Sequence, residues 1–272
     1  MIIGIDHVLI AVENLDKARD LYLRLGFEVL YGGKHELAGT HNAVIPLADG
    51  SYLELVGVTD PTLARQFPFS RQVLEALERA NRFATFALET NDYGRDVQAI
   101  RDRGLAISKA APGERLRPDG ERVSWWTAHP EDPRLPFLIQ DLTPRVLRVP
   151  AVSEGIGGST HMGRVEIGAA ALQPMITAYT QLLGNRPAED TFSLQRGVVK
   201  LSQSFSDDGI QMVVLLSQDT DRIAGDWKAR GIPFYDEQIR GAGRVLVPRD
   251  TDGARISFCQ AQWHDRDCKS GG

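Results

Sequence analysis

The stretch GIDHVLIAVENLDKARDLYLRLGF, residues 4–27, decides the fold because a strand, a helix and a stop signal follow one another directly. Gly4–Val12 has the alternation of a β-strand, and one face carries Val8, Ile10 and Val12. Leu15–Leu25 has the spacing of an amphipathic helix, with an apolar stripe of Leu15, Ala18, Leu21, Tyr22 and Leu25. Asn14 is a typical N-cap, and Gly26 is a typical C′ residue.

Three strand-like segments follow this helix, at Phe27–Tyr31, His41–Leu47 and Tyr52–Val58. Between the last two lies Asp49-Gly50, which is typical of a two-residue hairpin turn of type I′. The first 58 residues therefore predict a module in the order β-α-β-β-β.

The same order of elements recurs further along the chain. A strand at Phe83–Thr90 and a helix at Asp92–Arg103 precede Gly104, which lies 78 residues after Gly26. Two more strands are expected, at Arg122–Thr127 and Pro136–Asp141. This ungapped repetition favours true repeats over two unrelated α+β units.

Two further copies follow in the C-terminal half. The third has a strand at Gly163–Ala169, a helix at Leu172–Leu183 and then Gly184, and the fourth has the corresponding segments Gln211–Leu216, Asp221–Arg230 and Gly231. Gly231 lies only 47 residues after Gly184, so we expect the third copy to have lost a strand. The sequence thus predicts two halves with two modules each.

Proline, glycine and serine between the two halves mark a boundary. We expect an N-terminal domain at 1–145 with an insert at 61–81, a linker at 146–160, a C-terminal domain at 161–262 and a polar tail at 263–272. A helix is expected at Ser70–Ala80 within the insert.

The composition predicts a soluble globular protein of the cytoplasm. The 272 residues are 42% hydrophobic and 25% charged, with a net charge of −5 and no basic stripe. Met1 to Ile5 lacks the features of a signal peptide, and Cys259 and Cys268 do not suffice for a disulfide framework. We expect a small-molecule ligand, no nucleic-acid or membrane partner, and a monomer or homodimer.

Strand parity predicts which residues face a cavity inside the sheets. If Val8, Ile10 and Val12 face the helices, His7 faces inward, and the same argument places Tyr52, Glu54 and Val56 inward. A two-residue turn at Asp49-Gly50 pairs Ile45 with Glu54, which puts His41 nearer the mouth of the same cavity. A buried Glu54 needs a partner, and His7 is the natural one.

The N-terminal segments carry a family resemblance. Gly4-Ile5-Asp6-His7-Val8, Leu25-Gly26-Phe27, Gly39-Thr40-His41-Asn42-Ala43 and Tyr52-Leu53-Glu54-Leu55 are similar to a glyoxalase-like branch of the vicinal oxygen chelate superfamily. The resemblance is specific over residues 4–58 and only general elsewhere. It implies an α+β fold in which paired βαβββ modules form half-open curved sheets with the helices outside.

The resemblance also implies a candidate site. By position, the ligands of a divalent metal ion of unknown identity would be His7, Glu54 and Gln140, while Thr85 stands at the fourth place. We also expect substrate contacts at His41, Asn42, Tyr52 and Trp126, the last being one of two tryptophans on a predicted strand. The C-terminal places fall on Arg164 or Val165, Met212 and Ser257, so any metal or ligand is expected in the N-terminal half.

Two functions remain open from the sequence. One is a metal-assisted lyase or isomerase acting on a small oxygenated metabolite, with Glu54 moving a proton beside a carbonyl. The other is metal-free binding or sequestration of a small molecule, which the missing ligand at Thr85 favours, and a purely structural His7–Glu54 pair is a third interpretation. His35, His129 and His264 are expected to be isolated and solvated, and Gly32-Gly33 to mark a turn.

Overall fold

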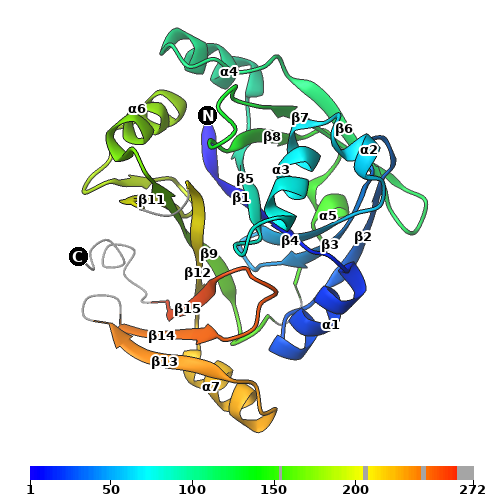
Figure 1. The fold of residues 1–272 in the computed structure, drawn as a ribbon, viewed down its shortest axis with the longest axis vertical. Helices are drawn as coiled ribbons and strands as arrows, with labels where there is room; N and C mark the ends of the chain where they lie inside the picture. Colours follow the sequence, from blue (N-terminus) through cyan, green and yellow to red (C-terminus); the bar gives the residue numbers. More distant parts are fainter. Residues whose placement is uncertain (153–154, 205–207, 240–242, 262–272) are drawn as a thin grey trace.

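A computed structural model describes residues 1–152, 155–204, 208–239 and 243–261 of the chain. Cys268, His264 and the predicted tail lie outside the described residues. Eight strands form a closed barrel, and seven form a second, open sheet beside it (Figure 1). The predicted α+β class is confirmed.

The barrel contains the first two modules. Its strands run in the order β1 (Ile2–Ala11), β4 (Tyr52–Val58), β3 (Thr40–Pro46), β2 (Leu30–His35), β6 (Ala111–Leu116), β7 (Arg122–Ala128), β8 (Phe137–Asp141) and β5 (Phe83–Thr90), which pairs back onto β1. The curved sheet expected for this half closes completely, because β2 reaches β6, where Lys34 pairs with Leu116. Gly32-Gly33 lies within β2 and is not a turn between elements.

The first helix forms where the sequence places it. α1 (Leu15–Leu25) begins at Asn14, whose side chain accepts a hydrogen bond from the Lys17 backbone N–H at 3.0 Å. It ends at Gly26, whose φ of +99° is in the left-handed region that favours glycine. α4 (Tyr93–Asp102) occupies the same place in the second module.

The hairpin between β3 and β4 differs from the prediction in register. Val44 pairs with Glu54, and Ile45 pairs with Leu53, so the two-residue turn is wrong. The last ladder pair is Pro46 with Tyr52, which leaves a connection of residues 47–51. A shift of one residue turns every side chain of β3 to the opposite face, so the barrel interior receives Asn42 and not His41.

The second sheet contains the two C-terminal modules. Its strands run in the order β10 (Thr191–Ser193), β11 (Val198–Gln203), β9 (Thr160–Ala169), β12 (Gly209–Ser217), β15 (Ile256–Gln260), β14 (Gly243–Pro248) and β13 (Phe234–Ile239). α6 (Leu172–Leu183) belongs to the third module and α7 (Thr220–Ala229) to the fourth. As predicted, the third module is one strand short, because only β10 and β11 follow its helix.

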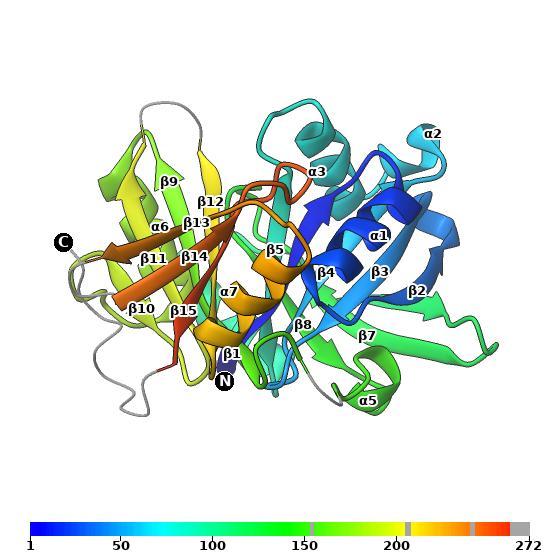
Figure 2. The same ribbon diagram turned by 90° about the horizontal axis from the view of Figure 1, so that it is seen from below.

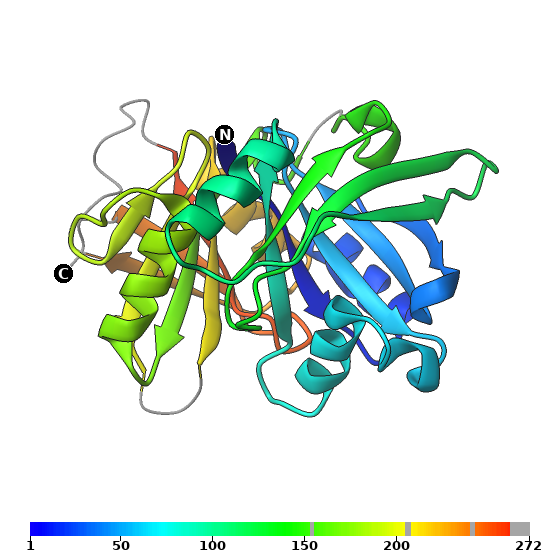
Figure 3. The ribbon, with the colours of Figure 1, turned by 90° about the horizontal axis from the view of Figure 1, so that it is seen from above.

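One apolar core joins the barrel to the second sheet, and the two lie side by side in Figures 2 and 3. Trp227 of α7 is fully buried and donates from Nε1 to the Leu25 carbonyl at the end of α1, at 2.8 Å. The Tyr22 hydroxyl donates to the Thr251 carbonyl at 3.1 Å. No helix among the described residues is long and apolar enough to cross a membrane.

Short helices close the two ends of the barrel. The 61–81 insert forms α2 (Pro61–Ala64) and α3 (Pro68–Leu77). α3 corresponds to the helix expected at Ser70–Ala80, but it begins and ends a few residues earlier. The short α5 (Arg145–Arg148) follows β8, and a single 3₁₀ turn, η1 (Glu36–Ala38), separates β2 from β3. Figure 2 shows α3 and α5 at opposite ends of the barrel. Val73 and Ala76 of α3 pack against interior residues of the barrel.

Candidate functional site

His7 and Glu54 lie together inside the barrel. β1 and β4 are parallel neighbours, with His7 opposite Tyr52 and Leu9 opposite Glu54. His7 Nε2 is 3.3 Å from Glu54 Oε2, and the two residues are 3% and 6% exposed. Their contact is therefore almost completely shielded from solvent.

Asp6 holds the other side of the His7 ring. The β1–β5 register shifts between Ile5 and His7, and this bulge leaves Asp6 without a ladder partner. Asp6 Oδ1 lies 2.6 Å from His7 Nδ1, and the Tyr52 ring stacks on the imidazole at a centroid distance of 4.4 Å. The histidine is thus fixed through both ring nitrogens and one face.

Two arginines from α5 neutralise Asp6. Arg148 is 3% exposed and donates to both Asp6 oxygens at 3.0 Å, to the Tyr52 hydroxyl at 2.7 Å and to Asp141 at 2.5 and 2.9 Å. Arg145 donates to Asp6 Oδ2 at 2.6 Å. Burial opposes ionisation of the Asp6 carboxyl, but Arg148, the hydrogen bond to His7, and Arg145 outweigh it and hold its pKa well below 3.8.

A second polar chain approaches Glu54 from β3 and β6. Asn42 Nδ2 donates to Glu54 Oε1 at 2.5 Å, and Arg115 Nη1 donates to Asn42 Oδ1 at 3.3 Å. Gly32 makes this packing feasible, because a Cβ there would lie 2.2 Å from Asn42 Oδ1 and 2.6 Å from Arg115 Nη1. Burial lowers the pKa of Arg115, although the nearby Glu54 carboxylate raises it in part.

Aromatic and imidazole rings surround these polar groups. Phe137 contacts the edge of His7 at a centroid distance of 5.7 Å and stacks on His129 at 4.8 Å. His35 hydrogen-bonds Thr40 at 3.0 Å and lies edge-on to Trp125 at 6.4 Å. The expectation that His35 and His129 are isolated and solvated is wrong, because both pack on aromatic rings. Burial lowers the pKa of each to about 4.

Three candidate residues face away from the barrel interior. His41 lies edge-on to Tyr31 at 6.5 Å on the other face of β3 from Asn42, because of the register shift. Trp126 packs on Tyr93 of α4 at 5.5 Å, so the inward tryptophan is Trp125. Gln140 accepts a hydrogen bond from the Tyr93 backbone N–H at 2.9 Å, so it is not placed to ligate a metal beside His7.

The interior side chains do not fit a resident divalent metal ion. Leu9 pairs with Glu54, and Ala87, which is 78 residues later, pairs with Phe137, so a phenylalanine stands where the second module would supply its carboxylate. Thr85, 6% exposed, stands where it would supply a second imidazole. Among the described residues no group of three histidine, cysteine or acidic side chains is arranged to hold a metal.

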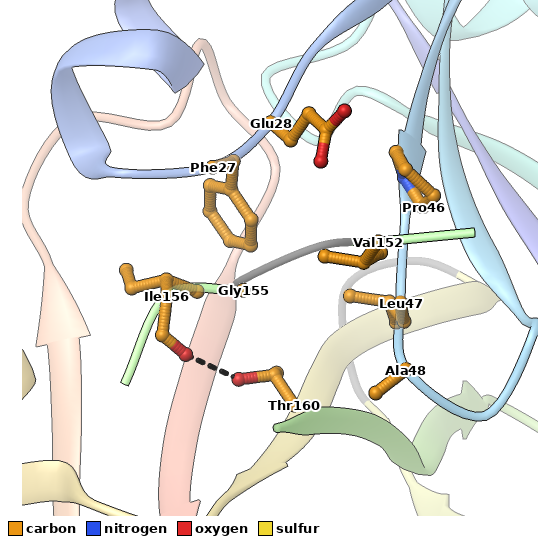
Figure 4. Close-up of a pocket in the computed structure, with 9 residues that line it drawn as sticks. All are labelled: Phe27, Glu28, Pro46, Leu47, Ala48, Val152, Gly155, Ile156 and Thr160. Carbon is orange, nitrogen blue, oxygen red and sulfur yellow. Dashed lines mark hydrogen bonds between the residues drawn. The ribbon is translucent and has the colours of Figure 1, made fainter. Parts of the chain in front are cut away.

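The remaining candidate positions carry no comparable chemistry. In the second sheet Arg164 pairs with Glu166 at 2.6 Å, and Ser257 is fully buried. Figure 4 shows a small crevice with Phe27 and Ile156 on one side and Pro46, Leu47 and Ala48 on the other, and below it the Thr160 hydroxyl donates to the Ile156 carbonyl. Among the described residues, Glu28 is the ionisable residue that lines it, and no described interior residue of the barrel takes part.

Sequence reasoning missed Asp6, Arg115 and Arg148. Asp6 precedes His7 directly, but regular strand parity points it away from the interior, and only the bulge reverses this. Arg148 belongs to a segment that was expected to be linker, and the spacing Asp141, Arg145, Arg148 was the available signal. Arg115 lay in a stretch without a predicted strand, so nothing in the sequence marked it.

Comparison with known proteins agrees with this fold. A family model for a glyoxalase-like domain matches residues 5–183. A search of curated proteins found no match. Solved structures with similar folds include a hypothetical protein from Staphylococcus aureus, with a TM-score of 0.72, 14% identity, and 96% of this chain and 100% of that chain covered. The same fold similarity extends to a mutant 4-hydroxymandelate synthase from Streptomyces coelicolor (TM-score 0.61, 12% identity, coverage 96% and 93%) and to a Mn(II)-bound glyoxalase from Novosphingobium aromaticivorans (0.56, 13%, 95% and 82%).

Proposed function

Because the chain belongs to the glyoxalase-like domain family, we propose that it is an enzyme that moves a proton beside the carbonyl of a small oxygenated metabolite, with Glu54 as the base and without a resident metal. The observation that carries this proposal is the buried chain of contacts from Asp6 through His7 to Glu54. Isomerase or lyase chemistry of this kind begins with removal of a proton from the carbon next to a carbonyl.

The proposed reaction uses one proton shared between His7 and Glu54. Asp6 is ionised and only accepts hydrogen bonds, so His7 Nδ1 must carry a proton and donate it. His7 Nε2 lies 3.3 Å from Glu54 Oε2, so the two side chains are close enough to exchange a proton. The pair is therefore organised to hold and release a single proton.

The reaction needs no further reactant. With the shared proton on His7 Nε2, Glu54 Oε2 takes the proton from the substrate carbon, and the C–H electron pair forms an enolate. Asn42 donates to Oε1 and keeps the carboxylate oriented, which leaves Oε2 to act. Return of the proton to the same carbon completes an exchange. In an α-hydroxycarbonyl compound the hydroxyl proton can first move to the enolate oxygen, and return of the abstracted proton to the former carbonyl carbon then completes an isomerisation, with no change in oxidation state overall.

Deuterium uptake at carbon tests this proposal. Pyruvate, dihydroxyacetone and methylglyoxal are incubated with the protein in D₂O, and loss of the signals of protons next to the carbonyl is followed by ¹H NMR. We expect the protein to accelerate exchange of at least one compound and Glu54→Gln to reduce that rate by about 100-fold or more. Glu166→Gln, which alters a part-buried paired carboxylate in the second sheet, is the matched control and should exchange like the unmodified chain.

Equal exchange in the Glu54→Gln variant would overturn the assignment of Glu54. Saturable binding of these compounds without any Glu54-dependent exchange would overturn the enzymatic proposal in favour of the metal-free binding function. The nearly closed interior, with Glu54 only 6% exposed, is the feature that would favour sequestration.

A further inference from the structure

Arg115 is a buried cation without an anionic partner. It is 5% exposed, and among the described residues no carboxylate oxygen lies within 4.0 Å of its guanidinium. Its hydrogen bonds go to neutral acceptors, from Nη1 to Asn42 Oδ1 at 3.3 Å and from Nη2 to the Arg148 carbonyl at 3.2 Å. Its Nε is buried and has no hydrogen-bond partner.

The other buried charges nearby are matched. Three carboxylates face three guanidinium groups. Arg145 and Arg148 each pair with Asp6 and with Asp141. Glu89 pairs with Arg145 and with Arg196. Glu54 reaches Arg115 only through the amide of Asn42. A buried guanidinium with an unpaired donor is costly, so the fold retains an unfavourable feature that an incoming anion would relieve.

The surroundings of Arg115 are built to hold this side chain. Its aliphatic stem lies over β2, where a Cβ at Gly33 would be 3.4 Å from Arg115 Cγ, and Gly32 leaves room for Nη1. On the same face of β6, Gly113 leaves room for Trp125, whose Nε1 would lie 2.3 Å from a Cβ at that position. The glycines thus leave room for a guanidinium and an indole on one face of neighbouring strands β6 and β7, one ladder position of the same parity apart.

We propose that the ligand of this barrel is a small carboxylate whose oxygens pair with Arg115 Nε and whose apolar or aromatic tail lies against Trp125. A carboxylate is the planar anion that matches a guanidinium edge best. The inference rests on the proposed function in one respect, because Asn42 bridges Arg115 and Glu54 and so places the carbon to be deprotonated close to the bound carboxylate.

Binding of benzoate compared with benzamide tests the charge requirement. The two have the same shape, but only benzoate is an anion, and neither has a proton on a carbon next to the carbonyl. By calorimetry we expect benzoate to bind the full chain, and benzamide to bind at least tenfold more weakly. Arg115→Gln should lower benzoate affinity by roughly tenfold to a hundredfold, as expected for loss of a charge-assisted pair. Arg134→Gln is the matched control, because it removes an exposed arginine paired with Asp132 and should leave affinity unchanged.

The unmodified chain provides a second readout, for which the conservative Arg115→Lys variant serves only to assign one signal. The N–H signal of Arg115 Nε, observed by ¹⁵N NMR and assigned from its absence in Arg115→Lys, should shift on titration with benzoate and not with benzamide. Equal affinities for the two compounds, or an unchanged Nε signal at saturating benzoate, would overturn the inference. Glu54→Gln should still bind benzoate, so failure of the base and failure of the anion site give different results.

Discussion

Replacing Arg148 by methionine removes the main cation from the buried end of the barrel while keeping much of the side chain's apolar bulk. Asp6, which is fully buried, loses its bonds to both Nη atoms of Arg148, and Asp141 loses two more. Breaking a buried ion pair on one side destabilises a protein by about 3–5 kcal/mol. Because Arg145 still reaches Asp6 Oδ2 at 2.6 Å, we expect a loss near the lower end, about 3 kcal/mol.

Urea denaturation and thermal melting measure this loss. For a chain of this size about 3 kcal/mol corresponds to a fall in melting temperature of roughly 6–12 °C. Arg134→Met, which removes an exposed arginine bound to Asp132, should lose at most about 1 kcal/mol. If Arg148→Met also lost less than about 1 kcal/mol, the buried charge cluster would not stabilise the barrel, and our account of Asp6 would be wrong.

The remaining predictions concern pH and packing. The folded pKa of Asp6 lies below its ordinary value of 3.8, so the ionised carboxylate stabilises the fold above about pH 4, and this stabilisation is lost as the pH falls through the folded pKa. The difference in unfolding free energy between the unmodified chain and Asp6→Asn should therefore shrink on acidification. His35 has a folded pKa of about 4 against an ordinary 6.5, so on acidification the unfolded chain takes up its proton first. As the pH falls from about 6.5 to about 4, the free energy of unfolding should therefore fall by about 3 kcal/mol. The His35→Gln variant should not show this fall. Gly32→Ala should cost about 1–3 kcal/mol in urea titrations, because its Cβ would meet Asn42. Gly225→Ala, in a helix with nothing within 4 Å, should instead stabilise by up to about 1 kcal/mol, and equal effects at the two glycines would contradict this reading.

Local signals predicted the modules well. α1 begins and ends as its N-cap and terminal glycine indicate, because a single helix with its own capping residues is determined by neighbours in sequence. The missing strand of the third module was also visible, since 47 residues between Gly184 and Gly231 leave too little chain.

Side-chain direction was predictable only where strands are regular. Tyr52 and Glu54 face inward as expected, because β4 has no bulge. His41 and Asn42 were both expected as substrate contacts, but the turn length turns only Asn42 inward. Trp126 and Gln140 pair with each other on the outer face of β7 and β8, which nothing in the sequence of these strands indicated. One residue of error exchanges the two faces of a strand.

Long-range partners could not be predicted. Asp6 and Arg148 are 142 positions apart, and their contact depends on a bulge in β1 and on α5 folding back across the barrel end. The bulge has no local sequence signal, and the spacing Asp141, Arg145, Arg148 does not show where α5 lies relative to β1. The residues that support His7 and Glu54 therefore became visible only in three dimensions.

Metal analysis of the full chain tests the central claim, that His7 and Glu54 work as a proton-holding pair without a metal ion. Protein purified without chelators is examined by elemental analysis and by melting before and after addition of a chelator. We predict less than stoichiometric metal and an unchanged melting temperature, while Glu54→Gln still abolishes deuterium exchange. One bound divalent ion per chain, lost in both His7→Ala and Glu54→Gln and accompanied by a lower melting temperature with chelator, would contradict the account.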